Sequence, residues 1–119
     1  MNLARHIHIM DDDKSTVEIV GLILGASGYN VTSENDGDMK FLQEDPLPDI
    51  IILDNNLGLD DGANVCKKLK AHKKTAHIPV ILISALQGID EIACSAGANT
   101  FLAKPFSMQQ LLEAIERVQ

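Results

Sequence analysis

The 119-residue sequence has few cysteines, few aromatic residues and little positive charge. It contains two cysteines, no tryptophan and 3% aromatic residues, and its 10 lysines and arginines are outnumbered by 17 aspartates and glutamates. Cys66 and Cys94 are far apart, so they form neither a redox CxxC pair nor a zinc knuckle, and we interpret them as two buried or spectator thiols. The net charge of -7 opposes binding to a phosphate backbone, which requires clustered cations. We therefore expect no direct contact with nucleic acid.

Long hydrophobic runs are also missing. The aliphatic blocks Ile50–Leu53 and Val80–Ile83 are far shorter than the roughly 20 apolar residues that cross a bilayer. The start, Met1–Arg5, has neither the apolar stretch nor the small-residue cleavage site of a secretory signal. The hydrophobic content of 45% is sufficient for one folded core. We therefore predict a single cytoplasmic domain over residues 1–119, with no membrane partner.

Five apolar blocks bounded by turn residues predict five strands. They cover residues 7–10, 29–32, 50–53, 80–83 and 100–103. Most are continuous aliphatic runs, which is typical of parallel strands covered on both faces by helices. The intervening patterns predict helices over 15–27, 38–43, 63–71 and 91–96, and a last helix that starts at Ser107. The alternation predicts an α/β fold with a doubly wound parallel sheet and five helices on its two faces.

The predicted helices have recognisable ends. Ser15 to Glu18 and Ser107 to Gln110 both have the spacing of a capping box. Gly28 and Gly97 follow two of the helices and can adopt the left-handed conformation of a C-terminal cap, and Asp45–Pro46 closes the helix 38–43.

Polar residues follow four of the predicted strands, at the edge where doubly wound folds have their functional crevice. They are Asp11–Asp13, Asp54, Ser84 and Lys104–Pro105. Carboxylates brought together at this edge repel each other, by about 4 kcal/mol per pair at about 4 Å and an effective dielectric constant of about 20. A hard divalent cation removes this repulsion, and the oxygen ligands indicate Mg²⁺, with Mn²⁺ as a substitute.

With a metal present, this set of residues indicates phosphoryl transfer. Asp54 stands alone after the most apolar strand and is the predicted nucleophile, whereas the adjacent Asp11 and Asp12 are better suited to holding an ion. Ser84 can donate a hydrogen bond to a phosphoryl oxygen, and Lys104 can pair with one. The peptide bond between Lys104 and the following proline is a candidate for the cis isomer.

These motifs, in this order, resemble the receiver domain of two-component response regulators over essentially the whole chain. The matching segments are Asp11–Asp12, Ile50–Asp54, Asp61–Gly62, Pro79–Ala85, Ala96–Ala98 and Phe101–Phe106. The resemblance implies a flavodoxin-like sheet with strand order 2-1-3-4-5. It also implies a bacterial signalling protein that catalyses only its own phosphorylation and dephosphorylation.

The resemblance implies roles for individual residues. Asp54 would accept a phosphoryl group from a sensor histidine kinase or a histidine phosphotransfer protein. Asp11, Asp12 and Asp54 would hold Mg²⁺ together with the main-chain carbonyl of Asn56.

The resemblance also implies a switch. Ser84 and Lys104 would contact the phosphoryl group, and Phe101 would turn inward when Ser84 moves. The signal would pass through the fourth helix, the fifth strand and the fifth helix, to a downstream protein or to an output domain outside this chain.

Four features depart from the family pattern, and one of them is the apolar Leu86, two residues after Ser84, where many members have a polar group. Gly58 stands where the family usually has proline, which predicts a looser loop after Asp54. The segment between Ser84 and Gly97 is about two residues short, so we expect a short fourth helix. Phe101 replaces the commoner tyrosine, so its switching would depend on packing alone.

Other functions compete with this one. A haloacid-dehalogenase-like phosphatase would use Asp11 as its nucleophile, but it needs more chain than 119 residues provide. A pseudo-receiver would keep the acidic pocket as a docking module without phosphorylation. A flavodoxin with a bound cofactor is disfavoured because the loop after the first strand is acidic.

Four groups of polar residues have simpler interpretations. Asp13 is predicted at a helix N-terminus, and Asp60 and Asp61 are predicted turn residues before Gly62. His6 and His8 share one face of a strand, and we interpret them as a packed pair rather than a metal site. The remaining group is a solvated helix end, made of Lys67, Lys68, Lys70, Lys73 and Lys74.

Overall fold

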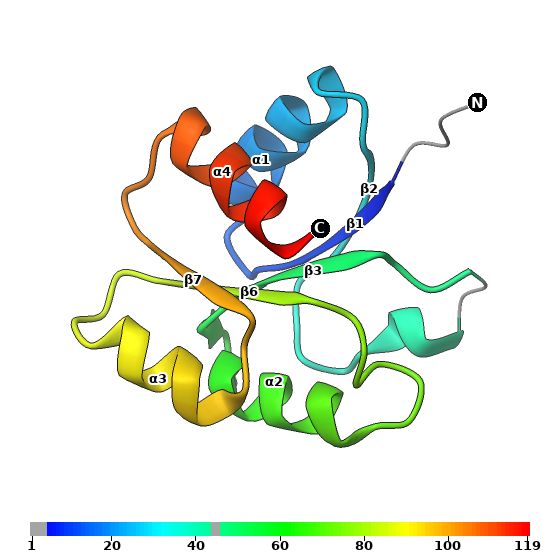
Figure 1. Cartoon of the computed structure of the whole chain (residues 1–119), viewed down its shortest axis with the longest axis vertical. Coiled ribbons are helices and arrows are strands. Elements are labelled where there is room, and N and C mark those ends of the chain that lie inside the picture. Colours follow the sequence, from blue (N-terminus) through cyan, green and yellow to red (C-terminus); the bar gives the residue numbers. More distant parts are fainter. Residues whose placement is uncertain (1–4, 44–45) are drawn as a thin grey trace.

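The computed structural model describes residues 5–43 and 46–119. Five strands form one parallel sheet in the order β2-β1-β3-β6-β7 (Figure 1). They are β1 His6–Met10, β2 Asn30–Glu34, β3 Ile50–Asp54, β6 Val80–Ser84 and β7 Thr100–Ala103. Counted along the chain without the short strands β4 and β5, this is the predicted order 2-1-3-4-5. The flavodoxin-like fold class is therefore confirmed.

Four α-helices occur in the part of the chain that the structure describes. They are α1 Lys14–Ala26, α2 Gly62–Ala71, α3 Ile89–Ala96 and α4 Met108–Val118. The predicted helix 38–43 is instead a single 3-10 turn, η1 Lys40–Gln43, so the prediction of five helices is wrong by one. Met39, just before this turn, has a positive φ of 55°, which a continuous α-helix excludes. The predicted stop at Asp45 lies outside the described residues.

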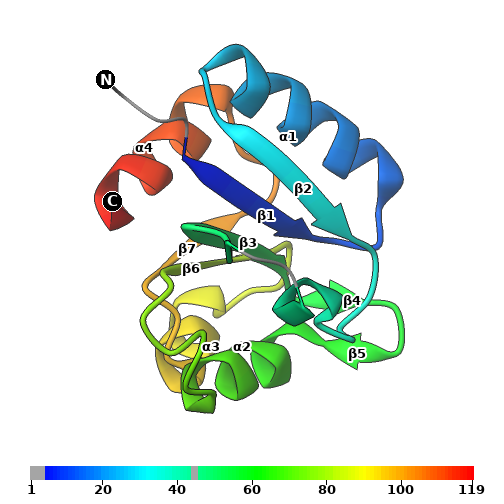
Figure 2. The ribbon, with the colours of Figure 1, turned by 90° about the vertical axis from the view of Figure 1, so that its right-hand side faces the viewer.

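The helices cover both faces of the sheet. Figure 1 shows α1 and α4 on one face and α2 and α3 on the other, and Figure 2 places η1 on the side of α2. Alternate residues of β3 divide between the two core clusters: Ile50 and Ile52 pack with the α1 and α4 side, and Ile51 and Leu53 pack with the α2 and α3 side. Every residue of β3 is buried. This explains why the strand is a continuous apolar run.

The helix ends test the capping predictions. Asp13 caps α1 and accepts a hydrogen bond from the N–H of Ser15 at 3.1 Å, so the helix begins at Lys14 and the predicted cap at Ser15 is wrong. The capping box of Ser107 and Gln110 is confirmed at the start of α4. No helix in residues 5–43 and 46–119 is both long and apolar enough to span a bilayer.

Candidate functional site

Three carboxylates meet at the carboxyl edge of the sheet. Asp11 and Asp12 follow β1, Asp54 ends β3, and one oxygen of each lies within 4.8 Å of the others. Asp11 and Asp54 are only 2% and 5% exposed, whereas Asp12 faces solvent. The structure therefore brings together the three side chains that the sequence assigned to a cation.

Lys104 supplies a positive charge to this cluster from the end of β7. Its Nζ lies 3.2 Å from Oδ2 of Asp54 and 3.7 Å from Oδ2 of Asp11. Its backbone N–H donates to the carbonyl of Ser84 at 2.9 Å, which ties the end of β7 to the end of β6. The Lys104–Pro105 peptide bond is cis, the isomer considered from the sequence.

The carboxyl group of Asp11 has a raised pKa. This pKa is raised to about 6, mainly by burial and also by the neighbouring carboxylate of Asp54, while the N–H of Asp13 at 2.9 Å and the charge of Lys104 oppose the shift. The cluster without a cation therefore has one carboxylate that is expensive to ionise. A divalent cation would favour ionisation of all three carboxylates.

A small hairpin borders the cluster where we predicted a looser loop. Strands β4 Asn56–Leu57 and β5 Asp60–Asp61 pair antiparallel around Gly58, whose φ is +66°. The N–H of Gly58 donates to Oδ2 of Asp12 at 3.1 Å. Proline could neither adopt this φ nor donate this hydrogen bond. The departure from the family pattern thus has its own structural use here.

A pocket of about 420 Å³ opens beside Asp54. Its wall joins the hairpin to the ends of β6 and β7 and consists of Asp54, Asn55, Asn56, Asp60, Asp61, Ser84, Ala85, Leu86 and Lys104. Ser84 is 3% exposed, and its Oγ accepts a hydrogen bond from the N–H of Leu86 at 2.9 Å. Four of the predicted site residues, including Asn56, therefore surround one space next to the carboxylates.

Sequence reasoning missed Asn55, which holds the backbone after Asp54. Its carbonyl accepts a hydrogen bond from the N–H of Gly62 at 2.8 Å, and its side-chain oxygen accepts one from the N–H of Ala63 at 3.1 Å. Asp61 caps α2 through the same N–H at 2.9 Å. The available signal was an asparagine that directly follows the strand-ending aspartate, a residue type that often bonds to nearby backbone.

Gly62 is the tightest point of this loop, so an added methyl group there has a predictable effect. A Cβ on Gly62 would lie 2.6 Å from Cα of Asn55 and would also clash with the carbonyl oxygen of Asp54. We expect Gly62→Ala to lower the free energy of unfolding by about 1–3 kcal/mol because the backbone has to move. In urea unfolding, the matched control Gly25→Ala is expected to gain about 0.5–1 kcal/mol, since a helical alanine is favoured over glycine.

Gly25 suits this comparison because its Cβ would meet no atom within 4 Å. Equal stability changes in the two variants would contradict a steric role of Gly62.

The other residues considered from the sequence have different surroundings. Phe101 is on β7 and 42% exposed, and it is not among the residues described as lining the pocket. Asp13 caps α1, as predicted, and Asp60 accepts a hydrogen bond from the N–H of Gly37 at 3.0 Å. His8 is buried with hydrogen-bonded partners, which agrees with the interpretation of a packed pair.

Comparison with known proteins decides the family. Residues 7–116 match the family model for the response regulator receiver domain. The chain belongs to this family. Receiver domains of two-component systems interact with histidine kinases, and the receiver domain is not by itself a family of catalytic enzymes.

Individual relatives agree with this family. The chain is 37% identical over 112 residues to the DNA-binding dual master transcriptional regulator RpaA of Synechocystis sp., covering 92% of this chain and 46% of that protein. It therefore spans less than half the length of that relative.

Solved structures share the fold over nearly the whole receiver domain. A putative response regulator from Chloroflexus aurantiacus superposes with a TM-score of 0.89 at 32% identity, over 98% of each chain. The receiver domain of the sensor histidine kinase PA1611 from Pseudomonas aeruginosa superposes with a TM-score of 0.84 at 28% identity, over 97% of each chain. The latter structure has a magnesium ion in its active-site cleft.

Proposed function

We propose that this receiver domain is a phosphorylation switch in which Asp54 accepts a phosphoryl group from a phosphohistidine donor in a Mg²⁺-dependent reaction. One observation carries the proposal: the buried carboxylate of Asp54 lies 3.2 Å from Nζ of Lys104 and shares a cluster within 4.8 Å with two further carboxylates. Few arrangements other than phosphoryl transfer use a carboxylate nucleophile, a cation site and a lysine together.

The residues present fit a magnesium ion. Asp11, Asp12 and Asp54 offer only oxygen ligands, and the main-chain carbonyl of Asn56 is our proposed fourth protein ligand. The magnesium ion in the cleft of the PA1611 receiver domain supports this assignment. A bound Mg²⁺ would neutralise charge on the phosphoryl oxygens.

Three residues of this chain act in the proposed phosphoryl transfer: Asp54, Lys104 and Ser84. A carboxylate oxygen of Asp54 forms a bond to phosphorus, while the bond between phosphorus and the imidazole nitrogen of the donor breaks, and the electron pair leaves with that nitrogen. Lys104 balances the negative charge of the phosphoryl oxygens, and the hydroxyl of Ser84 donates a hydrogen bond to one of them. Transfer of the phosphoryl group from Asp54 to water returns the domain to its unphosphorylated state. The domain therefore catalyses only its own phosphorylation and dephosphorylation.

Phosphorylation would change the surface of the domain. The product carries an added charge of about -1.5 to -2, which draws Ser84 and Lys104 toward Asp54. We propose that Phe101 follows Ser84 and that the face formed by α3, β7 and α4 shifts its population of conformers. A downstream protein or an output domain would read this face in the cytoplasm.

The test is the intact mass of the wild-type chain after incubation with acetyl phosphate. We expect the gain of one phosphoryl group with Mg²⁺, and no gain when EDTA removes the metal. A folded protein that gains nothing under both conditions would contradict the proposal and would favour a docking module that works without phosphorylation.

The phosphohistidine donor has to approach Asp54, and an apolar groove lies beside it. This groove of about 430 Å³ shares Ala85 and Lys104 with the acidic pocket. Its apolar wall comes from α1 and the segment after β7 and includes Ile19, Ile23, Phe106 and Met108. Ile19 and Met108 are each 58% exposed. We propose that the groove receives the helical domain that carries the phosphohistidine.

Ile19→Glu tests this groove. We expect it to slow phosphoryl transfer from a phosphohistidine protein by about tenfold or more, because a charge in an apolar contact commonly costs more than about 1.4 kcal/mol. Phosphorylation by acetyl phosphate should stay unchanged, since a small donor does not need the groove. The matched control is Leu22→Glu, because Leu22 is 75% exposed on the same helix and does not line the groove. Equal slowing by both variants would contradict the groove assignment.

A further inference from the structure

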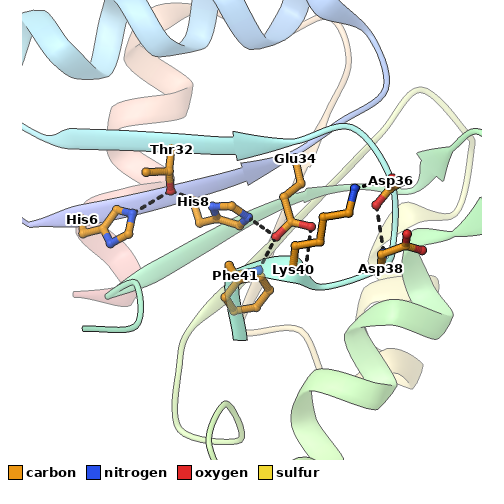
Figure 3. A network of polar contacts seen from close by, with 8 residues as sticks. All are labelled: His6, His8, Thr32, Glu34, Asp36, Asp38, Lys40 and Phe41. Atoms are coloured by element: carbon orange, nitrogen blue, oxygen red, sulfur yellow. Dashed lines mark hydrogen bonds and ion pairs between the residues drawn. The ribbon is translucent and has the colours of Figure 1, made fainter. Parts of the chain in front are cut away.

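A chain of polar side chains links β1 to β2 on one face of the sheet and ends at Glu34, beside the hollow that Asp11 and Asp12 line (Figure 3). His8 is 1% exposed. Its Nδ1 lies 2.7 Å from Oγ1 of Thr32, and its Nε2 lies 3.0 Å from Oε1 of Glu34. His6, which is only partly buried, extends the chain outward, because its Nε2 lies 2.6 Å from the same Thr32 oxygen. One hydroxyl therefore bridges two imidazole rings.

Glu34 connects this chain to the crossover formed by residues 35–43. Its Oε2 accepts a hydrogen bond from the N–H of Lys40 at 2.9 Å, and its Oε1 accepts one from the N–H of Phe41 at 2.7 Å. The ring of Phe41 lies 4.7 Å from the ring of His8 and is itself buried. The Glu34 carboxylate therefore holds the start of η1 against the sheet and contacts His8 at the same time.

The donors and acceptors among these groups determine which atom carries the hydrogen in each contact. An ionised carboxylate only accepts, so Nε2 of His8 carries the hydrogen that points to Glu34. When His8 is neutral, its Nδ1 must accept the hydroxyl proton of Thr32. The Thr32 oxygen then accepts the N–H of His6. Every short contact has one donor and one acceptor in this arrangement.

We propose that His6, Thr32, His8 and Glu34 form a proton relay in which the two histidines share a single added proton and fasten the crossover 35–43 more tightly when they bind it. A proton from solvent binds Nδ1 of His6. The Nε2 proton of His6 passes to Oγ1 of Thr32, and the hydroxyl proton of Thr32 passes to Nδ1 of His8. His6 ends as the neutral Nδ1–H tautomer, Thr32 keeps one proton, and His8 becomes cationic against Glu34.

A second proton is unfavourable in this relay. If both rings were cationic, the Thr32 oxygen would accept from both, its own proton would have neither ring as an acceptor, and two positive charges would lie on either side of one hydroxyl. Protonation of one ring therefore disfavours protonation of the other, because a nearby like charge opposes the charged form. The hydrogen bond from neutral His8 to the ionised Glu34 is already charge-assisted. With the shared proton on His8 it joins two opposite charges, whose attraction is stronger in the buried surroundings than in water.

The charged groups around the relay come from every neighbouring element. Asp49, before β3, accepts the backbone N–H of His6 at 2.8 Å, and Nζ of Lys40 on η1 lies 3.6 Å from Asp36. The thiol of Cys66 on α2 belongs to the same core cluster as Phe41.

The hollow next to Glu34 is also lined by Asp11, Asp12 and Lys14. Within the described residues, His8 lies at ion-pair distance from Glu34 and is its cationic partner only when the ring is protonated.

NMR of the imidazole nitrogens tests the relay between about pH 5 and about pH 8, where histidine commonly changes its charge. In the wild-type protein we expect the nitrogen shifts of both rings to change with a shared midpoint that accounts for one proton. Thr32→Val removes the hydroxyl with little change in shape, so the two rings should titrate independently. Thr32→Ser keeps the hydroxyl and should keep the coupling. Identical titration curves in wild type and Thr32→Val would overturn the relay.

Hydrogen exchange gives a second measurement. After correction for the intrinsic pH dependence of exchange, the protection of the Phe41 amide should rise several-fold from about pH 8 to about pH 5 in the wild-type chain, and should change less in Thr32→Val. If Thr32→Val does not fold, His6→Gln replaces it, because it removes the outer ring and leaves Thr32, His8 and Glu34 in place. His8 is then expected to titrate as a single independent group. A His8 ring that keeps one protonation state in every variant would overturn the proposal.

Discussion

Replacing Asp54 with alanine is expected to abolish the Mg²⁺-dependent gain of a phosphoryl group from acetyl phosphate. The carboxylate of Asp54 belongs to the cation cluster and to the wall of the pocket that Ser84 and Lys104 also line, and its loss removes the nucleophile. The intact mass of the variant should equal that of the untreated protein under conditions that modify the wild type. The expected effect is complete loss rather than slowing, because no other residue in our proposal takes its place.

The control for this experiment is Asp60→Asn. Asp60 is an exposed aspartate of the same pocket, and it lies outside the three-carboxylate cluster. The Asp60→Asn variant should still be phosphorylated on Asp54. Peptide mass mapping of the wild type adds a second criterion, since the receiver mechanism places the modification on Asp54 and the phosphatase alternative places it on Asp11. Modification of the Asp54→Ala variant at Asp11 would contradict the proposed function.

Asp11→Asn is expected to stabilise the metal-free protein and to weaken its response to Mg²⁺. Burial and the carboxylate of Asp54 raise the pKa of Asp11 to about 6, so ionising Asp11 opposes folding at neutral pH. Asparagine keeps an oxygen to accept the N–H of Asp13, which bonds to Oδ1 of Asp11 at 2.9 Å in the wild type. We expect a gain in the free energy of unfolding on the order of 1–2 kcal/mol at pH 7 without metal. Urea unfolding with and without Mg²⁺ measures both effects.

The pH dependence of this effect has a definite sign. The ordinary pKa of 3.8 is raised to about 6 in the folded state, so between these values the folded protein binds more protons than the unfolded one. The stability contributed by Asp11 therefore falls as the pH rises from about 4 to about 6 and stays low above that range. Asp11→Asn should lack this component, and Asp60→Asn should retain it. Mg²⁺ should stabilise the wild type less below pH 6, because the ion then competes with a proton. Equal pH profiles for wild type and Asp11→Asn would contradict this account.

Most of the fold could be predicted because its signals are local. Ile50–Leu53 and Val80–Ile83 are continuous apolar runs, and both strands are buried on two faces in the structure. Parallel strands place their carboxyl ends at one edge, so the sequence alone assigns Asp54, Ser84 and Lys104 to one pocket.

Features that depend on contacts between distant segments could not be predicted. The segment 38–43 has a helical pattern, but Glu34 binds the amides of Lys40 and Phe41 and holds it as one 3-10 turn. Gly58 predicted a looser loop, whereas its left-handed φ closes a hairpin and its N–H reaches Asp12, 46 residues away in sequence. His8 could be expected in a packed pair, but its connection to Glu34 depends on the register between β1 and β2.

The sequence by itself therefore determined the order of the five strands of the main sheet, four of the helices and the residue types at the strand ends, because burial patterns and turn residues act over a few neighbouring positions. Only the tertiary structure decided which of these groups share charge and protons. The acidity of Asp11 and the proposed relay through Thr32 arise from distances of about 3–5 Å between segments that are far apart in the chain. Such distances are set by the packing of the whole sheet and its helices, which no short stretch of sequence contains.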